Sequence, residues 1–203
     1  LAIMAPGTGL GMGLAIRHGG QVVPLASEGG HADFAPFDEE TLSLWRYIRA
    51  RRGRVSLESV LSGAGLERIY QWRRHLGDTH PDPRTARRIE ASDDPPAQIS
   101  SLAMARQDPV CVRAMACFVR CLGAAAGNLA LTAATSGGLY LAGGIAPKIL
   151  PELKHGAFEA AFLDKGRFRD FLAKVPVRVI LTESAPVLGA ARVARLFRND
   201  SKP

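Results

Sequence analysis

The sequence is poor in several residue types that would point to particular protein classes. Aromatic residues make up only 6% of its 203 residues, while Gly, Ala and Leu are plentiful, which favours close-packed helices over an all-β sandwich. Only three cysteines are present, and because they form an odd set in one apolar stretch they argue against a disulfide framework: Cys111, Cys117 and Cys121. We interpret them as small buried thiols in a reducing cytoplasm, with half of a metal site as the alternative.

Long uncharged apolar runs are also absent from the sequence. No stretch reaches the roughly 18 consecutive apolar residues that a membrane span requires, so we predict no membrane partner. The start, LAIMAPGTGLG, lacks the basic segment of a secretion signal, has no initiator Met and begins inside an apolar run. We therefore expect a cytoplasmic protein and a chain that is part of a longer one.

The net charge of +7 makes nucleic acid a partner to consider. Two stretches, RYIRARRGR (46–54) and RIYQWRRH (68–75), interleave arginine with aromatic residues, as some nucleic-acid binders do. The same arginines fit the exposed faces of amphipathic helices, with Leu42, Trp45 and Ile48 facing inward. Because no helix-turn-helix, zinc-finger or RNP signature accompanies them, we predict no nucleic-acid partner and keep polyanion binding as an alternative.

The hydrophobic pattern divides the chain into three stretches. Residues 1–26 predict strands, including a hairpin around Gly19-Gly20. Residues 38–134 predict mostly helix, with a loop at 77–85, a helix start near 95 and a long apolar helix from 108 to 134. The last third alternates strand and helix, over 137–144, 146–153, 176–182 and 185–197. This order predicts an α/β fold, a mixed sheet with helices packed on it.

Two glycine-rich loops are candidates for ligand binding. APGTGLG (5–11) is not a Walker A loop, because no Gly-Lys-Ser/Thr follows, but its N–H groups and the Thr8 hydroxyl suit a phosphate. A tight hairpin would use the same residues, and this alternative stays open. YLAGGIAPKI (140–149) predicts a strand that ends in Gly143-Gly144 and a helix with Pro147 in its first turn. That helix N-terminus would face a ligand, with plain strand–helix packing as the alternative.

The stretch SEGGHADFA (27–35) places Glu28 and His31 on either side of two glycines. Glycines let a backbone or a ligand approach closely, so both side chains would border an open surface. A carboxylate and an imidazole can bind hydroxyl groups, ligate a metal or transfer protons. The residues alone leave these three functions open.

Together these stretches resemble the bacterial glucokinase family, sugar kinases with the hexokinase or actin-like ATPase fold. The blocks that carry the resemblance are GTGLG, EGGHADFAP, RVSLESVLSGAGL, GNLAL, LAGGIAPKIL, FLDKGRF and PVLGAARVA, in the family's order. The resemblance covers essentially the whole chain. It implies a ribonuclease H-like large domain over 1–203, with a helical segment at about 38–134. It excludes the related ROK group with structural zinc, because no Cys lies near His31, and implies no metal held by this chain.

The resemblance also implies roles for individual residues. Three would hydrogen-bond the hydroxyls of glucose: Glu28, His31 and Glu58. Five would hold the nucleotide, the first three at its phosphates and the last two at its adenosine: Gly7, Thr8, Gly9, Gly143 and Gly144. The implied cofactors are ATP and Mg²⁺, the latter arriving with the nucleotide.

The sequence departs from the family pattern in one respect. The family's Asp-Gly-Gly-Thr loop and its Asn-Asp pair, which supplies the general base, have no counterpart here. We therefore assign no catalytic residue and expect a C-terminal large domain without its N-terminal small domain, inactive alone. A homodimer through the helices at 38–75 and 108–134 is also expected. The phosphoryl donor stays open between ATP, ADP and polyphosphate, and the sugar stays open between glucose and other hexoses. A non-catalytic sugar-binding or regulatory role also stays an alternative.

Overall fold

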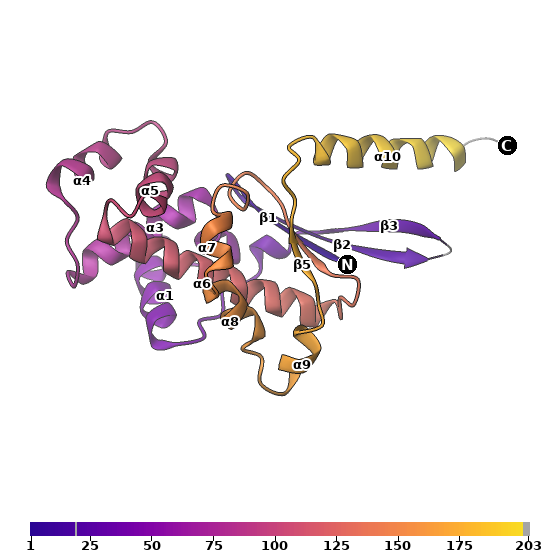
Figure 1. Cartoon of the computed structure of the whole chain (residues 1–203), viewed down its shortest axis with the longest axis horizontal. Helices are drawn as coiled ribbons and strands as arrows, with labels where there is room; N and C mark the ends of the chain where they lie inside the picture. The colour runs from indigo at the N-terminus through magenta and orange to yellow at the C-terminus, as the bar shows by residue number, and fades with distance from the viewer. Residues whose placement is uncertain (19, 201–203) are drawn as a thin grey trace.

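Five strands form one mixed sheet in the computed structural model, which describes residues 1–18 and 20–200 (Figure 1). The strands are β1 (Ala2–Pro6), β2 (Leu10–His18), β3 (Gln21–Ser27), β4 (Leu139–Leu141) and β5 (Val177–Val179). Their order is β3-β2-β1-β4-β5, with β1 antiparallel to β2 and parallel to β4. The predicted α/β fold class and all of its strands are confirmed.

The central third of the chain is helical, as predicted. Its helices are α1 (Glu39–Arg52), α2 (Leu57–Val60), α3 (Gly63–Leu76), α4 (Pro83–Glu90), α5 (Pro95–Met104) and α6 (Pro109–Thr132). The loop predicted over 77–85 is wrong in its last part, because α4 begins at Pro83. The Asp82 side chain accepts a hydrogen bond from the Thr85 N–H, and Pro83 needs no partner in the first turn.

The last third contains short helical segments and one longer final helix. They are α7 (Leu150–Lys154), α8 (Ala157–Leu163), η2 (Gly166–Phe168), α9 (Arg169–Leu172) and the longer α10 (Ala185–Asp200). Another short segment, η1 (Gly29–His31), lies earlier in the chain, between β3 and α1. The helix predicted at 146–153 is wrong at its start, because residues 143–149 form turns and Pro147 precedes α7. The Ile145 N–H donates to the Pro6 carbonyl at 3.2 Å, which holds this segment against β1.

Helix α6 forms the centre of the molecule (Figure 1). By length and composition it could cross a membrane, but 78% of its most apolar window is buried inside the protein, as in the core helix of a globular fold. Its cysteines, the three predicted buried thiols, are free and buried. Because α6 packs on α3, α5 and α8, most of the helix expected at 108–134 to form a homodimer surface is buried within the chain.

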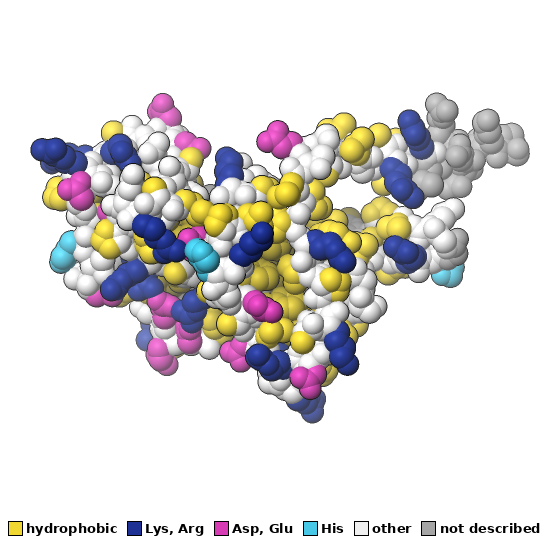
Figure 2. All heavy atoms as spheres, in the orientation of Figure 1, with side chains coloured by type: hydrophobic (Ala, Val, Ile, Leu, Met, Phe, Trp, Pro, Cys, Tyr) yellow, Lys and Arg dark blue, Asp and Glu magenta, His cyan; other side chains and the backbone are white. Residues whose placement is uncertain are grey.

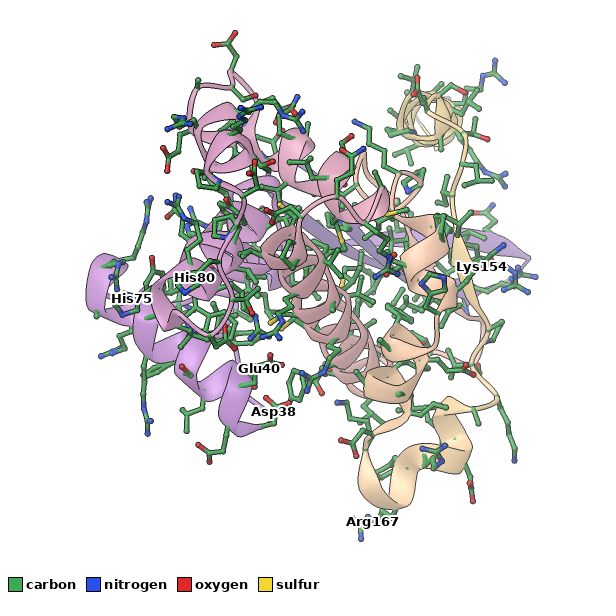
Figure 3. All side chains as sticks on the ribbon, turned by 60° about the vertical axis from the view of Figure 1, so that its left-hand side comes forward. Asp38, Glu40, His75, His80, Lys154 and Arg167 are labelled. Atoms are coloured by element: carbon green, nitrogen blue, oxygen red, sulfur yellow. The ribbon has the colours of Figure 1, made fainter. Side chains whose placement is uncertain are left out.

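Charged side chains join α1, α3 and α6 at one end of this core. Arg120 pairs with both Asp38 and Glu40, and Glu40 also pairs with Arg73. In Figure 3 the labelled Asp38 and Glu40 lie between the start of α1 and α6. Burial by itself raises the pKa of Asp38, but hydrogen bonds from Thr41 and the charge of Arg120 outweigh it and lower that pKa. The Asp38 carboxylate therefore stays ionised, and these ion pairs serve the fold.

A hollow lined with hydrophobic side chains opens between β5 and the segment of α7, α8 and α9 (Figure 2). Its volume is about 450 Å³, and apart from Lys154 and Glu159 its lining is apolar, including Leu153, Phe158 and Val179. A sugar needs several fixed polar groups around its hydroxyls. This cavity is therefore not the predicted sugar site.

Candidate functional site

Two of the predicted glycine loops lie side by side at one edge of the sheet. Strands β1 and β4 are parallel and end at this edge, and the Ala142 N–H donates to the Met4 carbonyl at 2.9 Å just beyond β4. A Cβ atom added to Gly7 would lie 4.0 Å from the Gly144 nitrogen. The carboxyl ends of parallel strands are where open α/β sheets bind ligands. The structure thus brings together the residues assigned to the phosphates and to the adenosine.

The loop of Gly7, Thr8 and Gly9 connects β1 to β2 and lies at the start of α3. The Gly63 N–H, in the first turn of this 14-residue helix, donates to the Gly7 carbonyl at 2.8 Å. Thr8 is exposed at the loop. The positive end of the helix dipole therefore lies next to the loop, and the Thr8 hydroxyl is accessible to an anion. The hairpin alternative also holds, since the same residues make the tight connection.

The two glycines after β4 have different surroundings. Gly143 has a φ of +77°, and a Cβ atom there would lie 2.4 Å from the Pro6 carbonyl oxygen. Gly144 has no atom within 4 Å of a Cβ position. Gly143 is thus needed for backbone packing against β1, and only Gly144 borders open space where a ligand can approach. The expected helix N-terminus does not follow them, because α7 begins at Leu150.

Glu58 is held next to the loop of Gly7, Thr8 and Gly9. It lies in the first turn of α2, which Ser56 caps together with Ser59. Its Oε2 accepts a hydrogen bond from the Leu10 N–H at 2.9 Å and would be 2.6 Å from a Cβ atom on Gly9. Within the part of the chain that the structure describes, Oε1 has no hydrogen-bond partner. One oxygen of this half-buried carboxylate therefore fixes the backbone, and the other can accept a hydrogen bond from a ligand.

Glu28 and His31 flank η1 on the other side of Leu10. Their carboxylate Oε2 and imidazole Nε2 are 3.9 Å apart, and their side chains are 92% and 59% exposed. Gly30, between them, is so close to β2 that a Cβ atom would lie 2.0 Å from the Leu10 carbonyl oxygen. Leu10 therefore contacts Glu58 through its N–H and η1 through its carbonyl. The three residues assigned to glucose, Glu28, His31 and Glu58, lie around the backbone of Leu10. We call the surface that they form the candidate sugar wall.

Arg54 positions this wall, and the sequence analysis did not single it out. Its Nη2 donates to the His31 carbonyl at 2.8 Å, and its Nε donates to Asp33 Oδ1 at 2.9 Å. The Leu57 N–H also donates to the Ala32 carbonyl at 2.8 Å. These bonds fix the segment after η1 to the start of α2. No local pattern could reveal them, because Arg54 lies within an arginine-rich stretch and 21 residues from Asp33.

The comparisons with known proteins identify one family. The family model described as Glucokinase matches residues 1–196. The glucokinase of Nostoc sp. (strain PCC 7120) is 41% identical over 206 residues, which cover 96% of this chain and 60% of that protein. The crystal structure of a glucokinase from an Antarctic psychrotroph has a TM-score of 0.79 at 33% identity, covering 94% of this chain and 56% of that one.

A more distant relative shares the fold alone. The ROK family glucokinase from Streptomyces griseus, solved in complex with glucose and AMPPNP, has a TM-score of 0.61 at 24% identity, over 96% of this chain and 60% of that one. The chain thus spans about 60% of the length of the first curated relative named above. With a family model that matches nearly its full length and the fold of sugar kinases, this chain belongs to the glucokinase family.

Proposed function

We propose that this chain is the sugar- and nucleotide-binding part of a glucokinase, which transfers the γ-phosphoryl group of ATP to the 6-hydroxyl of glucose. The observation that carries the proposal is the position of Leu10, which contacts Glu58 and η1 directly after the phosphate loop. Phosphoryl transfer depends mainly on holding the acceptor and the phosphates in line. A backbone shared by both sites is suited to this task.

The sugar would bind between Glu58, Glu28 and His31. The unpartnered Glu58 Oε1 accepts a hydrogen bond from one hydroxyl, and Glu28 and His31 bind others from the opposite side of Leu10. His31 acts here as a hydrogen-bonding partner of the sugar and ligates no metal. A site that hydrogen-bonds several hydroxyls discriminates strongly against analogues that lack them, because its polar groups are then left unpaired.

The nucleotide would bind at the two glycine loops. Gly7, Thr8 and Gly9 lie against the N-terminus of α3 and offer donors to the phosphates, and Gly144 leaves space for the adenosine. Among the residues that the structure describes, no three His, Cys, Asp or Glu side chains are grouped so that they could hold a metal ion. The resemblance to the family implies that Mg²⁺ arrives with the nucleotide, and we keep this as part of the proposal.

This chain positions the reactants, and we assign the acceptance of the hydroxyl proton to another part of the complete enzyme. The proton acceptor expected from the family is an aspartate in an Asn-Asp pair of the family's first half, whereas the Asn-Asp pair of this sequence is Asn199-Asp200, after the last family block. A cytoplasmic homodimer remains part of the proposal, and sedimentation at micromolar concentration tests its assembly. Only a monomer under these conditions would contradict the dimer.

Replacing Glu58 by glutamine should weaken glucose binding without unfolding the chain. The amide oxygen can still accept from the Leu10 N–H, but the charge-assisted bond to the sugar is lost, which costs about 1.5–3 kcal/mol. Titration calorimetry with glucose measures the change. Glu39→Gln, which removes the same charge from the start of α1, is the control. Unchanged glucose affinity in Glu58→Gln would remove this residue from the site.

A coupled assay for glucose 6-phosphate tests the transfer itself. We expect no useful turnover from the chain alone with glucose, ATP and Mg²⁺. We expect turnover when the N-terminal part of a glucokinase relative, including its Asn-Asp pair, is added to the mixture. Glucose binding without turnover in either mixture would favour a non-catalytic sugar-binding protein instead.

A further inference from the structure

The two arginine-rich stretches of the sequence meet at a cavity that the proposed function does not use. The cavity lies between α1 and α3 and has a volume of about 310 Å³. Its lining combines basic, polar and aromatic side chains: Tyr47, Ile48, Arg51, Arg52, Arg68 and Gln71. This volume is at the lower end of small-molecule sites, which span roughly 300–1,000 Å³.

The arginines of this cavity are not neutralised by the protein. Most other arginines near these helices pair with a carboxylate, as Arg54, Arg73 and Arg74 do. Over residues 1–18 and 20–195, whose side chains the structure describes, no carboxylate oxygen forms an ion pair within 4 Å of Arg51, Arg52 or Arg68. Glu67 and Glu58 are close enough to raise the pKa of Arg68, but neither pairs with it, and Glu67 accepts a hydrogen bond from the Gln71 amide at 3.0 Å. The cavity therefore carries an excess of positive charge.

Arg68 in particular has an unmet hydrogen-bonding group. Its Nη1 donates to the Ser59 carbonyl at 2.9 Å, but its Nε is buried without a partner in the described structure. Burial and the neighbouring charge of Arg52 lower the pKa of Arg68 by more than Glu67 and Glu58 raise it, so the protein destabilises this cation on balance. Arg51 is held in place, with its guanidinium 3.6 Å from the centre of the Tyr47 ring. An anion at this position would relieve the repulsion.

We propose that this cavity binds a small phosphate-bearing anion through the guanidinium groups of Arg51, Arg52 and Arg68. A guanidinium group can donate two parallel hydrogen bonds to the oxygens of one phosphate. Three such groups around one small cavity suit a phosphomonoester or a diphosphate. The cavity is separate from the glycine loops and the sugar wall in its lining residues. The inference does not rest on the proposed function, and its test needs neither sugar nor turnover.

The site is also one hydrogen bond away from the candidate sugar wall. Arg68 holds the Ser59 carbonyl, and Ser59 completes the cap of α2, the helix that carries Glu58. An anion that engages Arg68 would therefore act on a side chain that positions α2. This link to the sugar wall rests on the proposed function, whereas anion binding by the cavity does not.

The test is titration calorimetry of the chain with inorganic pyrophosphate at constant ionic strength. We expect Arg52→Ala to bind pyrophosphate at least about tenfold more weakly than wild type. The loss of one charge-assisted hydrogen bond changes a dissociation constant by a factor of about ten or more. Arg68→Lys should show a similar loss, since it keeps the charge but not the fork of donors. Arg46→Ala is the matched control, as it removes the same charge from an exposed position of α1 outside the cavity.

Arg52 is exposed, so its replacement leaves the core intact, and circular dichroism verifies this. Pyrophosphate binding that is unchanged in Arg52→Ala and Arg68→Lys would place any anion elsewhere, such as at the glycine loops, and overturn the proposal. Equal losses in Arg46→Ala and Arg52→Ala would also overturn it, by showing general charge attraction. So would binding of duplex DNA, with no binding of pyrophosphate, because the surface would then be one for nucleic acid.

Discussion

Replacing Gly143 by alanine should destabilise the chain by about 2–5 kcal/mol, the largest effect that we expect from a single substitution. At its φ of +77° an L side chain is strained, and its Cβ atom would lie 2.4 Å from the Pro6 carbonyl oxygen. This oxygen belongs to the end of β1 and accepts the Ile145 N–H, so it cannot retreat without breaking a bond. The segment after β4 would separate from β1, and the loop of Gly7, Thr8 and Gly9 would lose its neighbour Gly144.

Denaturant unfolding of Gly143→Ala and wild type measures this loss. Gly144→Ala is the matched control, because its Cβ atom would meet nothing within 4 Å and its φ lies outside the left-handed region. We expect the control to be neutral or slightly stabilising, since alanine reduces the entropy of the unfolded chain. Equal stability of the two variants would contradict the close approach of Gly143 to β1.

Replacing Gly30 by alanine should both destabilise the chain and abolish glucose binding. Its Cβ atom would lie 2.0 Å from the carbonyl oxygen and 3.1 Å from the carbonyl carbon of Leu10. Overpacking of this kind costs about 1–3 kcal/mol and is relieved by moving η1 away from β2. Leu10 also holds Glu58, so this movement would separate Glu28 and His31 from Glu58.

The control for this prediction is Gly29→Ala. A Cβ atom added at Gly29 would lie 3.1–3.2 Å from the ends of the Ser27 and Met12 side chains, which can rotate away. Glucose calorimetry and denaturant unfolding of both variants separate binding from stability. Gly29→Ala should keep most of its glucose affinity, whereas Gly30→Ala should lose it. If Gly30→Ala still binds glucose as wild type does, then the position of η1 on Leu10 is irrelevant to the sugar.

Local features of this protein follow from its sequence. The strands around residues 1–26, the long apolar helix and the acidic start of α1 were predictable because alternation, helical periodicity and caps depend on neighbours within a few residues. The start of α4 was missed although its signals were local, since Asp82-Pro83 also fits a loop. The ordered motif blocks were enough to indicate the family.

Tertiary structure alone decided which of these motifs meet. Nothing in the sequence shows that the Leu10 carbonyl packs closely against Gly30 while the Leu10 N–H donates to Glu58, 48 residues away. The turns at 143–149 have the same origin, because Gly143 and Ile145 are held by the end of β1 in place of a helix. The role of Arg54 and the meeting of two arginine-rich stretches at one cavity also depend on how α1, α2 and α3 pack. Contacts between distant segments are selected by burial and hydrogen bonding of the whole chain, which local patterns do not record.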